Sequence, residues 1–226
     1  LLAQFLNLGV GPATVYFVGR GDVGALQAAY ENGRLGLVVS GAGVAGALVV
    51  LYFFGVTLFP GVPTALLLLG LAAFPASLLL MYFNTILQGI EDFRAFNWTT
   101  LVPPYVTLAG AGITLFLFGI GTEAAVAAYL VGQVAGLLSA LLFLRHRFRH
   151  PTEKRAGQAI ESYRRRLLHY GWKAHLSNIM AFVNYRADIF LVNLFLNPAA
   201  TGVYVIAVQI AEKLWMLSQA ASTVLL

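Results

Sequence analysis

Residues 167–196 read LLHYGWKAHLSNIMAFVNYRADIFLVNLFL, and this stretch decides the fold class. It is apolar along most of its length, and a helix of roughly 20 residues is long enough to cross the hydrocarbon core of a bilayer. The stretch nevertheless carries Lys173, Arg186 and Asp188. A charge near the middle of a membrane costs at least ~2.5 kcal/mol, so such residues face a bundle interior or a watery cavity. We therefore expect an all-α, polytopic transporter-like bundle.

The composition places the whole chain in a membrane. Of 226 residues, 59% are apolar and 10% are charged, and the mean hydropathy is +0.79. Soluble proteins carry about 25% charged residues. The absence of cysteine excludes disulfides and thiolate metal sites. Because apolar runs are already under way at Leu1 and still continue at Leu226, we expect a piece of a longer protein, truncated at both ends.

The apolar runs predict about seven transmembrane helices. The predicted spans are residues 1–18, 35–58, 64–88, 101–118, 122–144, 167–196 and 199–226. Residues 19–34 and 88–98 are too polar to span, so we expect them to be solvated or interfacial connectors. Pro103 and Pro104 are expected to open the fourth span, because proline disrupts a helix interior.

Small and amide side chains inside the spans are expected to serve helix packing. Gly132 and Gly136 form a GxxxG step, which in a polytopic chain indicates a close contact between two of its own helices. Asn84 and Gln133 stand alone in their spans, and we assign them to helix contacts as well.

Residues 145–166, RHRFRHPTEKRAGQAIESYRRR, hold eight Lys or Arg against two Glu. Short loops rich in Lys and Arg stay in the cytoplasm, so we expect this connector to be cytoplasmic and the protein to be a multi-pass protein of the cell (inner) membrane. An alternative interpretation is contact with anionic lipid or phosphate. Nucleic acid is not an expected partner, because the basic residues concentrate in one loop. The connectors expected outside, which carry no Lys or Arg, are residues 59–63, 119–121 and 197–199.

The charges of the last two spans can be paired by geometry. Arg186 and Asp188 are two residues apart, about 200° around a helix, so they cannot pair on one face. In an antiparallel hairpin that turns near Asn197, residues whose numbers sum to about 395 lie at equal depth. This register puts Arg186 level with Gln209 and about one turn from Glu212. We predict a structural pair of Arg186 with Glu212.

A second polar face runs along residues 167–196. Ser177, Asn184 and Asp188 align at helical spacings of seven and four, and Lys173 extends the face towards the cytoplasm. Two interpretations stay open: the groups satisfy one another or nearby backbone, or they line a solvated substrate path. The candidate substrate-path residues are Lys173, Ser177, Asn184, Arg186, Asp188, Gln209, Glu212 and Lys213.

Three stretches occur in order: LNLGVGPATVYFVGRGD, FNTILQGIEDFRAFN and YGWKAHLSNIMAFVNYRADIFLVNLFLNPAATGVYVIAVQIAEKLW. Together they resemble the polysaccharide-biosynthesis flippases of the multidrug/oligosaccharidyl-lipid/polysaccharide exporter superfamily. The resemblance covers nearly the whole chain and implies two six-helix lobes, alternating access and a central cationic cavity for a lipid-linked oligosaccharide. It assigns residues 1–145 to most of the N-terminal lobe, residues 146–166 to a connector, and residues 167–226 to the first two spans of the C-terminal lobe.

We expect transport rather than catalysis, because the acidic loop pair Glu91 and Asp92 stands alone. No cofactor is expected, although H⁺ or Na⁺ is a candidate coupling ion. The expected partners are membrane lipids, a lipid-linked oligosaccharide carried on polyprenyl diphosphate, and polysaccharide-assembly proteins. A cation-coupled exporter of drugs or other small molecules and a transport-inactive scaffold remain as alternatives.

The charge balance of the two last spans bears on that choice. The basic residues Lys173, Arg186 and Lys213 exceed the acidic residues Asp188 and Glu212 by one charge. A net positive path favours an anionic, diphosphate-bearing lipid over a cationic drug.

Overall fold

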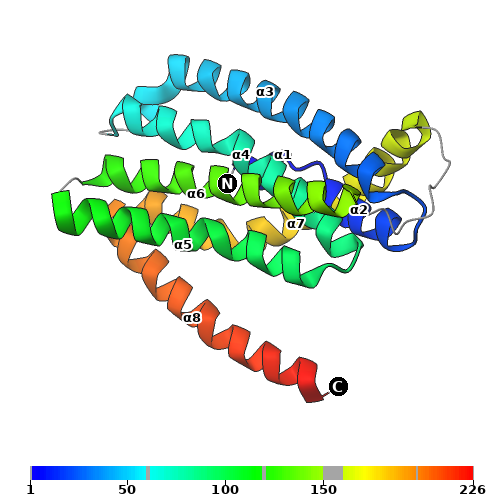
Figure 1. The fold of residues 1–226 in the computed structure, drawn as a ribbon. Coiled ribbons are helices and arrows are strands. Elements are labelled where there is room, and N and C mark those ends of the chain that lie inside the picture. The colour runs from blue at the N-terminus through cyan, green and yellow to red at the C-terminus, as the bar shows by residue number, and fades with distance from the viewer. Residues whose placement is uncertain (1, 60–61, 119–120, 150–159, 197, 226) are drawn as a thin grey trace. The chain divides into compact units, whose positions relative to one another are not determined.

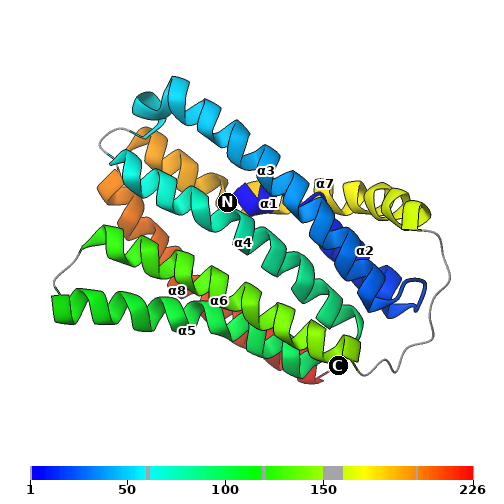
Figure 2. The same ribbon diagram turned by 45° about the horizontal axis from the view of Figure 1, so that its top comes forward.

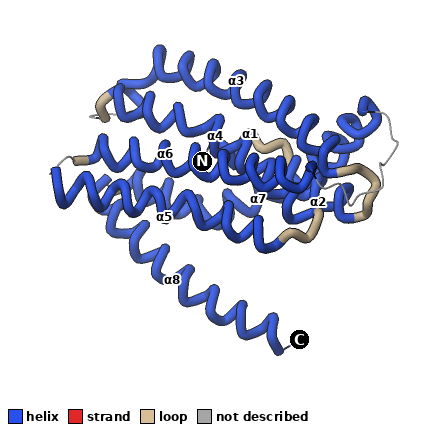
Figure 3. Tube along the Cα trace, in the orientation of Figure 1, coloured by secondary structure: helices blue, strands red, loops and turns tan. Residues whose placement is uncertain are grey.

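The computed structural model describes residues 2–59, 62–118, 121–149, 160–196 and 198–225. The described residues form eight helices and no strand (Figures 1 and 3). The helices are α1 (Leu2–Leu6), α2 (Val10–Gly19), α3 (Ala25–Leu58), α4 (Thr64–Gly89), α5 (Phe93–Phe118), α6 (Thr122–Arg149), α7 (Ile160–Phe195) and α8 (Pro198–Leu225). The all-α fold class is confirmed.

Four helical segments in the described part of the chain are long and apolar enough to cross a membrane: Ala25–Gly55, Thr64–Gly89, Phe93–Phe116 and Thr122–Phe148. Large apolar side chains on them, such as Tyr52 and Phe116, are exposed. Extensive exposed apolar surface marks contact with lipid or with other helices. The chain is a polytopic membrane protein.

Helices α7 and α8 are not among those four segments. Both are long enough to span, but Lys173, Arg186 and Asp188 lower the mean hydropathy of α7. Their assignment as spans therefore stays a prediction, and it depends on what faces the charged side chains.

The chain packs as two units, Leu1–Leu176 and Ser177–Leu226. In the first unit, α4 is the central helix: it contacts α2, α3, α5 and α6, and α5 also packs along α6 (Figures 1 and 2). Leu78, Tyr82 and Ile86 of α4 are fully buried. Because they are four residues apart, they form one stripe along the helix, and this stripe is the middle of the core.

The predicted span 1–18 is two helices rather than one. The helix breaks between α1 and α2, where Leu8 has a φ of 51° and Gly9 has a φ of 65°. Asn7 stabilises the break, since its Oδ1 accepts a hydrogen bond from the Gly9 amide at 2.8 Å. Its backbone oxygen accepts a hydrogen bond from the Tyr82 hydroxyl at 3.0 Å. The local asparagine bonds replace helical ones.

The break allows a close approach between two backbones. A Cβ at Gly9 would lie 1.9 Å from the carbonyl oxygen of Gly171 in α7, and a Cβ at Gly171 would lie 2.6 Å from the oxygen of Leu8. One turn further along α7, His175 Nδ1 lies 3.1 Å from Asn7 Oδ1. The first part of α7 is therefore fastened to the first unit through contacts that only glycine permits.

The predicted connector 19–34 is mostly helical, because α3 begins at Ala25. Glu31 and Asn32 were expected in a solvated connector, yet they are 2% and 0% exposed. The polar residues of this stretch were expected to be exposed to solvent. This expectation fails for Glu31 and Asn32, because polar side chains can gather inside a helix bundle.

The predicted connector 88–98 shrinks to residues 90–92. Helix α5 begins at Phe93, where Asp92 Oδ1 accepts a hydrogen bond from the Ala95 amide at 3.1 Å. A carboxylate in this position caps the free amides of a first turn. The fourth span thus starts eight residues earlier than expected.

Pro103 and Pro104 consequently lie inside α5, and the expectation that they open a helix was wrong. The two glycines of the GxxxG step pack against the same proline. A Cβ at Gly132 would lie 2.7 Å from the Pro103 carbonyl oxygen, and a Cβ at Gly136 would lie 2.5 Å from Pro103 Cγ. The interpretation of GxxxG as an intramolecular helix contact is confirmed.

Other predicted bounds fall closer to the structure. The span 64–88 corresponds to α4, and α6 continues past the predicted end at residue 144 to Arg149. Helix α7 begins at Ile160, so both ends of the connector 145–166 are helical, and residues 150–159 lie outside the described residues. The predicted turns 59–63, 119–121 and 197–199 lie partly outside them.

Candidate functional site

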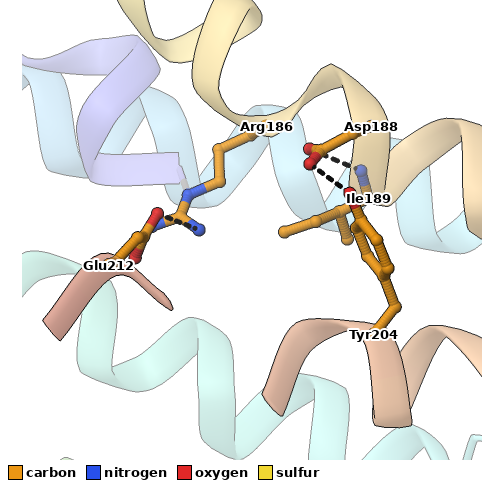
Figure 4. Close-up of polar contacts among 5 residues, drawn as sticks. All are labelled: Arg186, Asp188, Ile189, Tyr204 and Glu212. Carbon is orange, nitrogen blue, oxygen red and sulfur yellow. Dashed lines mark hydrogen bonds and ion pairs between the residues drawn. The ribbon is translucent and has the colours of Figure 1, made fainter. Parts of the chain in front are cut away.

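The predicted pair of Arg186 and Glu212 is present in the second unit (Figure 4). Arg186 Nη1 lies 3.1 Å from Glu212 Oε1, and Nη2 donates to Oε2 at 3.3 Å. Two parallel contacts between a guanidinium and a carboxylate fix the orientation of both groups. The two side chains are 34% and 37% exposed, so the pair is accessible from one side.

Asp188 has a different partner, which sequence reasoning missed. The Tyr204 hydroxyl donates a hydrogen bond to Asp188 Oδ2 at 2.7 Å, and the Ile189 amide donates to Oδ1 at 2.8 Å (Figure 4). The register that selected Glu212 also places Tyr204 about one turn from the level of Asp188. The signal was therefore in the sequence, but the partners considered for Asp188 were the polar groups of its own helix and nearby backbone, not a hydroxyl of the following span.

The remaining candidates of the second unit do not join these contacts. Ser177, Asn184, Gln209 and Lys213 are all exposed, and within the described ranges no hydrogen bond links any of them to Asp188. Lys173, in the first unit, is exposed as well. The exposed groups are available to solvent or to a ligand, so the role of the polar face as a substrate path stays a prediction.

The start of α7 is held to the first unit by Arg166. Its Nη2 lies 2.8 Å from Asp22 Oδ2, and its guanidinium carbon lies 4.6 Å from the centre of the Phe17 ring. An ion pair and a cation–π contact therefore place one basic residue of the connector in a defined position. This contact is structural, because it uses both the charge and the flat face of the arginine.

Asn84 and Gln133 do more than meet neighbouring helices. With Thr99 and Pro103 they line a cavity of about 440 Å³ between α4, α5 and α6. Asn84 Oδ1 is buried there without a hydrogen-bond partner among the described residues. The assignment to simple helix contacts was therefore incomplete, because the proline-containing part of α5 leaves space beside these side chains.

A second polar group in the first unit was also missed. Glu31 and Asn32 of α3, Thr14 of α2 and Tyr163 of α7 are all buried. Burial raises the pKa of Tyr163 to about 12, because the charged phenolate would lose its contact with water. The described residues contain no cluster of three or more His, Cys, Asp or Glu side chains that could hold a metal ion.

A family model described as "Polysaccharide biosynthesis protein" matches residues 2–226, which is almost the entire chain. The chain belongs to the polysaccharide biosynthesis protein family. The comparison with curated proteins and the comparison with solved structures each found no match. Family membership and the apolar helices together make this a multi-pass membrane protein of polysaccharide biosynthesis, and the resemblance noted in the sequence is confirmed.

The family match covers both units of the structure. The Arg186–Glu212 pair and the buried group around Glu31 therefore both lie within the family region. Neither is assigned a role by the match, so their roles must be argued from geometry.

Proposed function

We propose that this protein moves a lipid-linked oligosaccharide, carried on polyprenyl diphosphate, across the inner membrane by alternating access. The observation that carries the proposal is the family match over residues 2–226 in a chain of long apolar helices. A membrane step in polysaccharide biosynthesis requires that a large polar saccharide cross hydrocarbon, and a polytopic bundle with charged groups inside it suits that task.

The substrate group that suits the second unit best is the diphosphate. Arg186 presents a planar fork of donors, which matches phosphate oxygens as well as it matches the carboxylate of Glu212. The Arg186 side chain is about one-third exposed, so an anionic head group has access to it beside the carboxylate. Lys213, next to Glu212 and exposed, adds a second positive charge on α8. Exchange of the Glu212 contact for a diphosphate contact would link substrate binding to a change in the α7–α8 hairpin.

The same proposal places the connector 145–166 in the cytoplasm and makes membrane lipids and polysaccharide-assembly proteins the partners. The many Lys and Arg residues of this connector support its cytoplasmic placement, because short loops rich in these residues stay on the cytoplasmic side. Assembly of the saccharide on its lipid would occur on this side, so the substrate would be delivered where the basic residues lie.

Replacing Arg186 by lysine tests the diphosphate contact. Arg186→Lys keeps the charge and loses the two-pronged geometry, so we expect normal abundance with saccharide export lowered about tenfold or more. The measurement is complementation of polymer assembly in cells that lack the native protein, alongside the protein level.

The matched control is Lys173→Arg, an exchange in the opposite direction at an exposed lysine. It should leave export unchanged, because a long side chain near the interface can reach water by itself. Full export by Arg186→Lys at normal abundance would remove Arg186 from the substrate site. A parallel fall in abundance and export would assign Arg186 to the fold.

A further inference from the structure

Four polar side chains from three helices are buried together in the first unit. Thr14 of α2, Asn32 of α3 and Tyr163 of α7 are 0% exposed, and Glu31 of α3 is 2% exposed. Asn32 Nδ2 donates a hydrogen bond to Thr14 Oγ1 at 2.9 Å, and the Tyr163 hydroxyl lies close to Thr14 and Glu31. The sequence separates these residues widely, so the fold assembles the cluster.

Three oxygen atoms of this cluster lack a partner. Glu31 Oε1, Asn32 Oδ1 and the Tyr163 hydroxyl oxygen are buried and make no hydrogen bond to the described residues. Proteins rarely leave buried oxygens unsatisfied, and each exception calls for an explanation. The Glu31 carboxylate oxygen and Asn32 Oδ1 can only accept, so the group that satisfies them must be a donor or a cation, and the Tyr163 hydroxyl oxygen can contact the same group.

The charge of Glu31 favours a cation over water. The described residues provide no ion pair for Glu31: Arg166, one turn along α7 from Tyr163, pairs with Asp22 instead. A water molecule would hydrogen-bond to two of the oxygens but would leave the buried carboxylate uncompensated, which is strongly unfavourable. A cation satisfies several oxygens and balances the charge at the same time.

The donor set identifies the kind of cation. A carboxylate, an amide carbonyl and two hydroxyls are all oxygen ligands, which hard cations prefer. The cluster supplies one negative charge, which matches one monovalent ion, whereas calcium sites generally use more carboxylates. We propose that Thr14, Glu31, Asn32 and Tyr163 bind one sodium ion in the first unit. Its binding is independent of whether the protein moves a saccharide.

The experiment measures sodium binding directly, without transport. Full-length protein is purified into lipid nanodiscs, and its thermal unfolding and its equilibrium binding of radioactive Na⁺ are compared in sodium chloride and in choline chloride at equal ionic strength. A ligand that binds the native state raises the unfolding temperature. We expect wild type to be stabilised by Na⁺ and Glu31→Gln to lose that stabilisation and bind Na⁺ about tenfold or more weakly.

Two further variants complete the test. Glu123→Gln changes an exposed acid in the first turn of α6 and should keep the full response to Na⁺. Tyr163→Phe retains the ring packing and removes one oxygen, so its Na⁺ response should be smaller than that of wild type. Without Na⁺, Glu31→Gln should be at least as stable as wild type, because it removes an uncompensated buried charge.

The proposal is overturned if wild type shows no response to Na⁺, or if Glu31→Gln responds as strongly as Glu123→Gln. If Glu31→Gln does not fold, Tyr163→Phe decides: an undiminished response overturns the site, and a reduced one supports it. Saccharide export by Glu31→Gln is measured as well. If this variant loses Na⁺ binding and keeps export, or keeps Na⁺ binding and loses export, the sodium site and the proposed transport function are shown to be separate properties.

Discussion

Gly9→Ala is expected to destabilise the protein by about 3 kcal/mol or more, the largest effect of any single methyl group in the first unit. The new Cβ would lie 1.9 Å from the carbonyl oxygen of Gly171, and the residue has a φ of 65°. A left-handed backbone costs an alanine about 1–2 kcal/mol, and relief of the clash requires separation of two backbones, which costs about 1–3 kcal/mol more. The measurement is the midpoint of thermal unfolding together with the yield of monodisperse protein.

Gly41→Ala is the matched control. A Cβ at Gly41 meets nothing within 4 Å, and the residue lies inside α3 with ordinary helical geometry. Alanine there should be neutral or stabilise by roughly 0.5–1 kcal/mol, because glycine is a poor helix former. Equal tolerance of both substitutions would show that the contact between Gly9 and Gly171 is not close in the folded protein.

The Arg186–Glu212 pair is expected to give strongly non-additive substitutions. Arg186→Ala leaves the Glu212 carboxylate without its partner, and Glu212→Ala leaves the Arg186 guanidinium without its partner. In a membrane span, a lone charge costs at least ~2.5 kcal/mol. The double replacement removes both charges. It should therefore be closer to wild type than either single variant in folded yield and unfolding midpoint.

Lys213→Ala is the control for these two single variants and their double variant, because it removes an exposed charge beside Glu212. Its yield should stay near that of wild type. Losses that simply add in the Arg186 and Glu212 double variant would mean that the two side chains do not stabilise each other in the membrane.

The hairpin of the second unit shows what sequence can predict about this site. Helical rise and an antiparallel turn fix the relative depth of residues on two helices, so Glu212 could be chosen for Arg186 before any coordinates were known. The same rule places Tyr204 about one turn from the level of Asp188, where the two side chains form a hydrogen bond. It was missed because the partners of Asp188 were sought along its own helix and in nearby backbone, although a hydroxyl of the facing helix can also satisfy a carboxylate.

The first unit shows where sequence reasoning fails. Apolar runs located α4 well, because a long uninterrupted hydrophobic helix leaves little ambiguity. They could not reveal the break at Asn7, where the side chain bonds to local backbone and to groups distant in sequence. They also could not reveal the burial of Glu31, since its partners come from helices that only the tertiary fold brings together.

The central claim is movement of a lipid-linked oligosaccharide, and reconstitution tests it most directly. Full-length protein is placed in sealed vesicles that contain polyprenyl-diphosphate-linked oligosaccharide, and a membrane-impermeant glycosidase is added outside. Protein-free vesicles should expose only the outer-leaflet saccharide to cleavage. With wild-type protein, nearly all of the saccharide should become cleavable while the vesicles stay sealed to a trapped dye, and Arg186→Lys should slow this process. Cleavage that stops at the protein-free level in vesicles containing correctly folded wild-type protein would contradict the account.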